Sequence, residues 1–164
     1  MSMVFGEMNW SDESLDVGGN NRKEFNKDLF LRLSDGSNEV RLITQPYQYL
    51  VHKYKKNPED KKDFGQKILC SQIHGRCPVC DTGDKPKARW LLGVIDRATN
   101  KAKILDVSYT VMQQLKTNAR NPKIGDPTKY DINIVVNKSA GATGYYTVQT
   151  YQKEPLSVAE RGSF

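Results

Sequence analysis

The three cysteines of this 164-residue chain lie within eleven residues, in the segment 70–80 with the sequence CSQIHGRCPVC. Cys77 and Cys80 are separated by two residues, a spacing that lets one turn hold both sulfurs about 2.3 Å from a zinc ion. Zinc prefers four thiolate or imidazole ligands in a tetrahedron, so Cys70 and one histidine would complete a closed Cys3His site. Because a closed site leaves no position for water or substrate, the cluster predicts one structural Zn2+.

Two histidines could supply the fourth ligand. His74 lies between the cysteines, but its use would place four ligands within eleven residues and leave little chain to wrap round the ion. His52 lies ahead of the cluster, so its use would join two separate elements and lower the entropy of the unfolded chain. We therefore favour His52 and expect His74 to be a surface residue.

The sequence of the cluster argues against a catalytic use. Zinc deaminases need H-x-E followed by P-C-x-x-C, and neither histidine here is followed by a glutamate at that spacing. A glutaredoxin-type cysteine pair begins a helix, whereas residues 81–86 have the composition of a loop. The chain also has no P-loop, nucleophile elbow or close carboxylate pair. We expect a protein that is not an enzyme and has no small-molecule substrate.

Basic and aromatic residues surround the cysteine segment. The formal charge of the chain is +6, yet residues 52–103 alone hold thirteen basic and six acidic groups, a local charge of +7. Aromatic residues are interleaved with these cations. Such interleaving suits a single nucleic-acid strand, because cations follow the phosphates while rings stack on unpaired bases at about 1–3 kcal/mol each. The alternative is a solvated lysine-rich loop with the aromatic side chains in the core.

Hydrophobic periodicity predicts the elements that must position these residues. In chain order, the predicted strands cover 29–33, 40–42, 47–54, 64–69, 89–96, 102–107, 130–137 and 145–151. The turn at 34–38 would join the first two strands as a hairpin, and the turn at 98–101 would join a second hairpin. Ser108 is placed to cap the one predicted helix, which would run to about Ala119.

This order of elements predicts a mainly β protein. An OB-fold is a five-stranded Greek-key barrel, and its one short helix commonly lies before the last two strands, as it would here, although the pattern also describes another small barrel. We expect an OB-fold body at 27–152 with an inserted zinc-binding subdomain at about 52–88, a flexible N-terminal arm at 1–26 and a C-terminal tail at 153–164. The sequence has neither a membrane span nor a secretory signal at its start, so we expect a cytoplasmic protein with no membrane association.

Three motifs, in this order, resemble a known family. HKYKK at 52–56, CSQIHG at 70–75 and CPVC at 77–80 are similar to the zinc-binding stretch of the helix-destabilising single-stranded DNA-binding proteins of large tailed phages. The resemblance implies an OB-fold with an inserted zinc subdomain and a basic, aromatic-lined cleft between them. The ligands that it implies are His52, Cys70, Cys77 and Cys80.

The expected function is therefore that of a single-stranded DNA-binding protein, largely sequence-independent, that coats and protects unwound DNA in phage replication, recombination and repair. It would act in the cytoplasm of the infected bacterial host, with replication or transcription proteins as further partners. The expected phosphate contacts are Lys53, Lys55, Lys56, Arg76, Lys87 and Arg89. The rings expected to stack on bases are Tyr54, Trp90, Tyr109 and Tyr145, with burial in the core as the alternative for Trp90 and Tyr109.

The sequence departs from this family at both ends. Residues 1–31 carry six acidic and three basic groups, whereas the family's arm is basic and mediates cooperative binding. After Asp131 only Glu154 and Glu160 are acidic, whereas the family has an acidic tail that recruits replication partners.

The alternative function is a zinc-containing transcription or replication adaptor that binds protein first and DNA weakly. A single-stranded RNA binder is a third alternative, because no sugar-specific feature is present.

Overall fold

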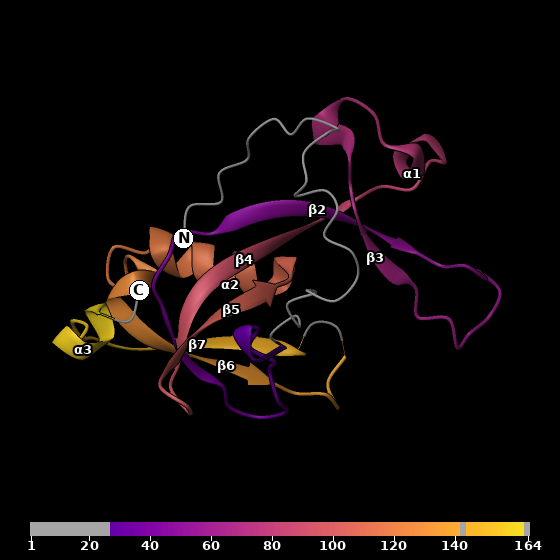
Figure 1. The fold of residues 1–164 in the computed structure, drawn as a ribbon. Helices are drawn as coiled ribbons and strands as arrows, with labels where there is room; N and C mark the ends of the chain where they lie inside the picture. The colour runs from indigo at the N-terminus through magenta and orange to yellow at the C-terminus, as the bar shows by residue number, and fades with distance from the viewer. Residues whose placement is uncertain (1–26, 142–143, 163–164) are drawn as a thin grey trace, which may run out of the picture.

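The computed structural model describes residues 27–141 and 144–162, and the predicted N-terminal arm at 1–26 lies outside them. The described chain forms one antiparallel sheet of seven strands with few helices (Figure 1), so the mainly β class is confirmed. The strands are β1 (Glu39–Leu42), β2 (Tyr47–Tyr54), β3 (Gln66–Leu69), β4 (Lys87–Asp96), β5 (Lys101–Val107), β6 (Tyr130–Val136) and β7 (Tyr146–Lys153). The helices are α1 (Pro78–Asp81), α2 (Tyr109–Arg120) and α3 (Val158–Arg161), with 3₁₀ turns η2 (Lys27–Leu29), η3 (Gln72–His74) and η4 (Pro127–Lys129).

Strand β4 organises the sheet because it pairs with three other strands. The order across the sheet is β3-β2-β4-β1-β6-β7, and β5 pairs with β4 off this path. The first half of β4 pairs with β2, with Leu91 opposite Tyr47. Its second half pairs with β1, with Asp96 opposite Val40, and β5 runs along its other side. Strands β1 and β2 therefore follow one another along the same edge of β4.

The core lies between this sheet and helix α2. Val40, Val94 and Ile132, which come from three different strands, are fully buried in it. Val111 and Leu115 bring one face of α2 against these strands, since residues four apart lie on the same side of a helix. The helix begins after Ser108, as predicted, although the Ser108 side chain makes no capping hydrogen bond.

Helix α2 also protects the outer edge of β7. The Gln114 side-chain amide donates from Nε2 to the carbonyl oxygen of Tyr146, and its Oε1 accepts from the backbone N–H of Val148, both at 2.9 Å. An unpaired strand edge is a template for pairing with another chain. The amide of Gln114 takes the place of a neighbouring strand at this point.

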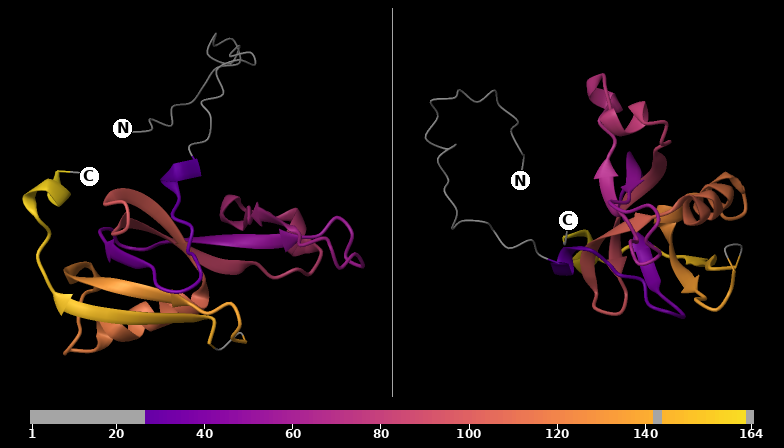
Figure 2. Two further views of the ribbon diagram at one scale, coloured as in Figure 1. Left: turned by 90° about the horizontal axis from the view of Figure 1, so that it is seen from below. Right: turned by 90° about the vertical axis from the view of Figure 1, so that its right-hand side faces the viewer.

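A hairpin carries the cysteine segment away from the rest of the sheet. β2 and β3 pair from Val51 opposite Leu69 to Tyr54 opposite Gln66. The ribbon views show the end of β2, together with β3 and α1, projecting beyond the rest of the sheet (Figure 2). Gly65, just before β3, has φ +74, and a Cβ there would lie 2.9 Å from the carbonyl oxygen of Tyr54. A side chain at this position would therefore clash with the facing strand of the hairpin.

Most of the predicted elements are confirmed, and the first hairpin is wrong. The strand predicted at 47–54 is β2 itself, the hairpin after the cysteines is β4 and β5, and the helix runs one residue beyond Ala119. The segment 29–33 is not a strand paired with β1: it begins in η2 and makes one isolated parallel bridge, between Phe30 and Ile104 of β5. Leu31 and Leu33 pack on the core from this irregular segment, whereas Leu29 is exposed.

Ion pairs hold the residues after β7 against the sheet. Both oxygens of the Asp131 carboxylate accept from Arg97, each at 3.0 Å, and Arg97 also pairs with Glu160 of α3. Ser157 and Glu160 form a capping box at the start of α3. The predicted C-terminal tail thus includes a docked helical turn. Among the described residues, no helix has the length and hydropathy needed to cross a bilayer.

Candidate metal centre and adjoining groove

Four side chains from the hairpin and the segment after it converge on one point. His52 lies on β2 and is 1% exposed, and Cys70 follows β3, where its backbone N–H donates to the carbonyl oxygen of Leu50 at 2.9 Å. Cys77 is the N-cap of α1, and Cys80 lies inside this single turn, which Pro78 starts. Strand pairing and one helical turn therefore bring ligands from distant positions in the chain together.

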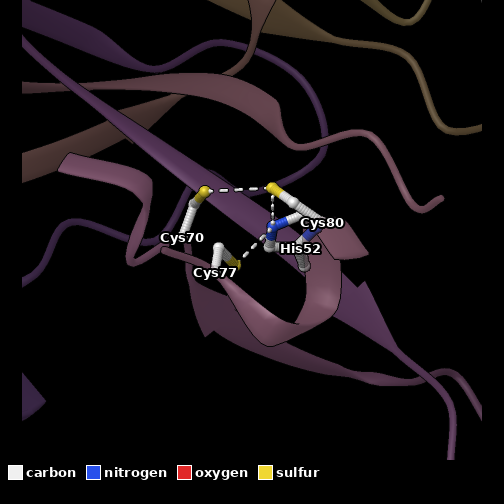
Figure 3. Close-up of side chains that lie close together, drawn as sticks. All are labelled: His52, Cys70, Cys77 and Cys80. Atoms are coloured by element: carbon white, nitrogen blue, oxygen red, sulfur yellow. Dashed lines mark hydrogen bonds between the residues drawn. The ribbon is translucent and has the colours of Figure 1, made fainter. Parts of the chain in front are cut away.

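The geometry of these four residues fits one tetrahedral cation. Nε2 of His52 lies 3.4 Å from Sγ of Cys77 and 3.4 Å from Sγ of Cys80, and Sγ of Cys70 lies 3.6 Å from Sγ of Cys80 (Figure 3). All four ligand atoms lie within 4.8 Å of one another. Zinc bonds of ordinary length and tetrahedral angle place sulfurs about 3.8 Å apart and a nitrogen about 3.6 Å from a sulfur. The cluster is close enough to bind a metal ion and is consistent with zinc.

Of the two histidines, the structure brings His52 to the three cysteines. His52 is in the cluster, whereas His74 is an exposed residue at the end of η3 and is not. His52 belongs to the sheet, so a cation at this position would join the cysteine segment to β2. This is the arrangement expected to reduce the entropy of the unfolded chain most.

The carboxylate of Asp84 completes the surroundings of His52. Its Oδ2 lies 2.7 Å from Nδ1 of His52, and this hydrogen bond raises the pKa of His52 to about 9. A histidine that binds metal through one ring nitrogen commonly donates the other N–H to a carboxylate, which fixes the tautomer and the ring orientation. Asp84 was not predicted, because a single aspartate four residues after Cys80 has no recognisable motif.

The turn that begins α1 favours the charged form of one sulfur. Backbone N–H groups, above all that of Cys80, lower the pKa of the Cys77 thiol. Burial, followed by the nearby sulfurs of Cys70 and Cys77, raises the pKa of the Cys80 thiol. The thiolate is the form that binds metal, so a cation at this centre would offset the unfavourable placement of several sulfurs side by side.

A groove of about 860 Å³ lies beside the metal cluster, our name for the group of His52 and the three cysteines. Residues of β2, β3 and β4, of the loops beside them and of the first turn of α2 line it. Five of the lining residues are basic and one, Asp84, is acidic, which suits a polyanion. The basic residues are Lys53, Lys67, Lys85, Lys87 and Arg89. Two aromatic residues also line the groove, Phe64 and Tyr109, and these side chains are 78% and 62% exposed.

Only some of the residues expected to contact DNA line the groove. Four of the ten line the groove: Lys53, Lys87, Arg89 and Tyr109. Three of the others, Tyr54, Lys55 and Lys56, are exposed at the end of the β2–β3 hairpin. Arg76 lies in the cysteine segment, where Nε donates to Asp81 at 2.8 Å. The Tyr145 ring packs edge-on against the ring of Tyr146, with centroids 4.6 Å apart.

Trp90 lines a different cavity. Because successive side chains of a strand point to opposite faces, Arg89 and Trp90 of β4 lie on different sides of the sheet. Trp90 lines a mostly apolar cavity of about 400 Å³ that Leu92, Met112 and other residues complete. Its ring centroid lies 6.5 Å from that of Tyr109, at an interplanar angle of 40°. The two rings therefore lie at the boundary between the groove and the apolar cavity.

Several lining residues were not among the predicted contacts. Phe64, Lys67 and Lys85 belong to the interleaved basic and aromatic series that the sequence displays, but nothing in that series indicated which members share one face. Tyr49 belongs to the same series and has another role. Its hydroxyl donates to Asp106 at 2.6 Å, and burial, reinforced by Asp106, raises its pKa to about 12.

Asp106 also holds two groove cations in place. Its Oδ1 accepts from Nε of Arg89 at 2.8 Å, and its Oδ2 lies 3.4 Å from Nζ of Lys67. The Arg89 side chain is 25% exposed, so part of the guanidinium faces solvent. A cation that is already oriented loses less conformational freedom when a phosphate binds.

The centre and the groove suit different chemistry. One imidazole and three thiols fit a closed structural metal site. The exposed cations and aromatic rings of the groove fit an anionic polymer that carries planar groups able to stack.

Comparison with protein-family models, with curated proteins and with solved structures finds no match to this chain.

Proposed function

We propose that this chain is a zinc-stabilised single-stranded DNA-binding protein of the tailed-phage type that the motifs at 52–80 resemble. The observation that carries the proposal is the groove beside the metal cluster, with five cations, one acid and two exposed rings. The cations would follow the phosphates while Phe64 and Tyr109 stack on bases. Stacking of this kind needs unpaired bases, so the groove favours a single strand over a duplex.

The strand pairings support an OB-fold assignment. In this assignment β1 and β2 form a bent first strand, β4 and β5 are the second and third, and β6 and β7 follow helix α2 as the fourth and fifth. The pairs β1–β4, β4–β5, β1–β6 and β6–β7 agree with the neighbours expected in such a barrel. Strand β3 and helix α1 then belong to an insertion between the first two strands.

We propose Zn2+ as the cation of the cluster, with His52, Cys70, Cys77 and Cys80 as its ligands. Bound there, it supplies a structural link between the sheet and the cysteine segment. Three sulfurs and one imidazole favour zinc over calcium or magnesium, which prefer oxygen ligands. The chain would coat and protect unwound DNA during replication, recombination and repair in the infected bacterial cell, without transforming a substrate.

Titration with fluorescent oligo(dT) and with a matched duplex tests this function. We expect submicromolar, sequence-tolerant binding of the single strand and weaker binding of the duplex. Equal affinity for the two would exclude stacking in the groove. A competition between matched DNA and RNA oligonucleotides decides which sugar the protein prefers, because no lining residue predicts the choice.

A protein-binding adaptor is the second candidate, and one observation favours it. Leu69 and Ile73, which lie close to Cys70 in the sequence, are 69% and 87% exposed. Exposed apolar side chains of this kind suit contact with another protein. An adaptor would bind oligo(dT) weakly or not at all, so the same titration separates the two candidates.

A further inference from the structure

Asp84 faces two sites at once. Its Oδ2 lies 2.7 Å from Nδ1 of His52, and the other ring nitrogen of His52 faces the sulfurs of Cys77 and Cys80. Asp84 also lines the groove, where it is the one acidic residue among the described residues that line it. The His52 side chain is fully buried, whereas 49% of the Asp84 side chain is exposed. The carboxylate therefore spans from a buried ring to an open surface.

The contact with His52 has a consequence for the metal centre. A histidine that binds a cation through Nε2 must carry its proton on Nδ1, and Asp84 is placed to accept that proton in a hydrogen bond. A carboxylate in this position holds the ring in one orientation and makes it a better ligand. Loss of such a partner typically lowers metal affinity about 10- to 100-fold.

The position of Asp84 in the groove should weaken the binding of an anionic chain, whereas its contact with His52 should strengthen the binding of a metal ion. A phosphate backbone that enters the groove meets five cations, two of which pair with Asp106, and the fixed negative charge of Asp84. Because the hydrogen bond to His52 restrains the Asp84 carboxylate, this charge cannot simply turn away from the phosphates. Interactions between partly exposed charges change an affinity by about two- to fivefold, so Asp84 would weaken the binding of an anionic chain to a modest extent.

We propose that Asp84 is a positioning residue that links the metal centre to the groove. It holds His52 in the tautomer and orientation that bind the cation, and the same hydrogen bond fixes a negative charge that weakens binding of a phosphate backbone. The groove half of this inference rests on the proposed function, and the metal half does not.

Two variants separate the two roles of the carboxylate. Asp84→Ala removes both the acceptor and the charge, whereas Asp84→Asn removes the charge and keeps an oxygen that can accept from Nδ1 of His52. Asp81→Asn is a matched control for the metal half: Asp81 is also 49% exposed, but it pairs with Arg76. Glu154→Gln is the control for the groove half, because it makes the same change of charge at an exposed residue outside the groove lining.

Two measurements on the full chain, loaded with zinc, test the proposal. Transfer of zinc to a chromogenic chelator should show about 10- to 100-fold weaker zinc binding in Asp84→Ala, a smaller loss in Asp84→Asn, and less than about a twofold change in Asp81→Asn. With zinc in excess, titration with oligo(dT) at low salt should show about two- to fivefold tighter binding for both Asp84 variants. Glu154→Gln should bind oligo(dT) as the wild type does.

The opposite directions of these effects distinguish a positioning role from a merely structural one. A general loss of structure would weaken zinc binding and DNA binding together, and that result would overturn the proposal. Wild-type zinc affinity in Asp84→Ala would also overturn it. If Asp84→Ala does not fold, Asp84→Asn still reports on both halves. If the wild type does not bind oligo(dT), the proposed function fails, and the chelator measurement still decides the metal half.

Discussion

Nε2 of His52 lies 3.4 Å from Sγ of Cys77, which is 25 positions later in the chain. The contact joins a buried position on β2 to the N-cap residue of α1. Apolar packing contributes little to holding this part of the chain, since Leu69 and Ile73 are largely exposed. We infer that a cation at the cluster supplies much of the free energy that keeps the cysteine segment folded against the sheet.

Removal of the metal should destabilise the protein. We expect one zinc per chain by elemental analysis, and loss of this zinc in Cys77→Ser. If zinc contributes about 4 kcal/mol, the stabilisation by a ligand at a thousand times its Kd, its loss should lower Tm by about 8–16 °C. Calorimetry with and without a strong chelator measures this shift.

The two histidines provide a matched pair for this test. His52→Ala should lose zinc and unfold at a lower temperature, whereas His74→Ala should keep both zinc and the wild-type Tm, because His74 lies outside the cluster. Zinc retained by His52→Ala but not by His74→Ala would show that His74, and not His52, is the fourth ligand.

Stacking in the groove should depend on Tyr109. Tyr109→Ala should weaken oligo(dT) binding about 5- to 150-fold, the equivalent of about 1–3 kcal/mol for one lost base stack. Tyr47→Ala is the control, because Tyr47 is 67% exposed, close to the 62% of Tyr109, and does not line the groove. A fluorescence titration measures both, and an equal effect of the two substitutions would contradict the assignment.

Phosphate contacts should be visible in the dependence of affinity on salt. Lys87→Ala should reduce the slope of log affinity against log salt by about 0.7, the contribution of one neutralised phosphate on a single strand. Lys101→Ala should leave the slope unchanged. Both lysines are exposed first residues of strands, Lys87 in β4 and Lys101 in β5, but only Lys87 lines the groove.

The docking of α3 should depend on pH through Glu160. The ion pair with Arg97 lowers the pKa of Glu160 to about 2, from an ordinary value of 4.5. Its contribution to stability is therefore fully present above about pH 4.5 and is lost as the pH falls through about 2. The Tm difference between wild type and Glu160→Gln should be greatest above pH 5 and narrow towards pH 2. A Tm difference that does not change with pH would contradict this role. Loss of zinc in acid lowers the Tm of both proteins alike, because both have the same metal centre, so it cancels from the difference.

The sequence predicts this fold where residue periodicity is strong. Strand β2 and helix α2 lie where alternation and helical spacing place them, because Val111 and Leu115 must face a core. The segment 29–33 has a similar alternation but runs beside β5 as an irregular segment, bonded to it through the N–H of Leu31. Periodicity records which side chains are buried, and it does not record which strand lies next to them.

The metal cluster was predictable and the groove was not. Two cysteines two residues apart restrict the chemistry to very few uses, so a metal site at the cysteines follows from residue types and spacing. The choice of His52 over His74 needed the further argument from chain entropy. Membership of the groove depends on which way each side chain points from a paired strand. Arg89 and Trp90 are adjacent in sequence yet line different cavities, and Phe64 reaches the groove from a loop.

The most direct test of single-stranded DNA binding in this groove is titration with oligo(dT) at two salt concentrations, with a matched duplex as competitor. Neutralisation of three to five phosphates by the groove cations predicts a fall of about 2 to 3.5 log units in affinity for each log unit of salt. We expect this slope together with a clear preference for the single strand. Affinity that does not change with salt, or equal affinity for the duplex, would contradict it.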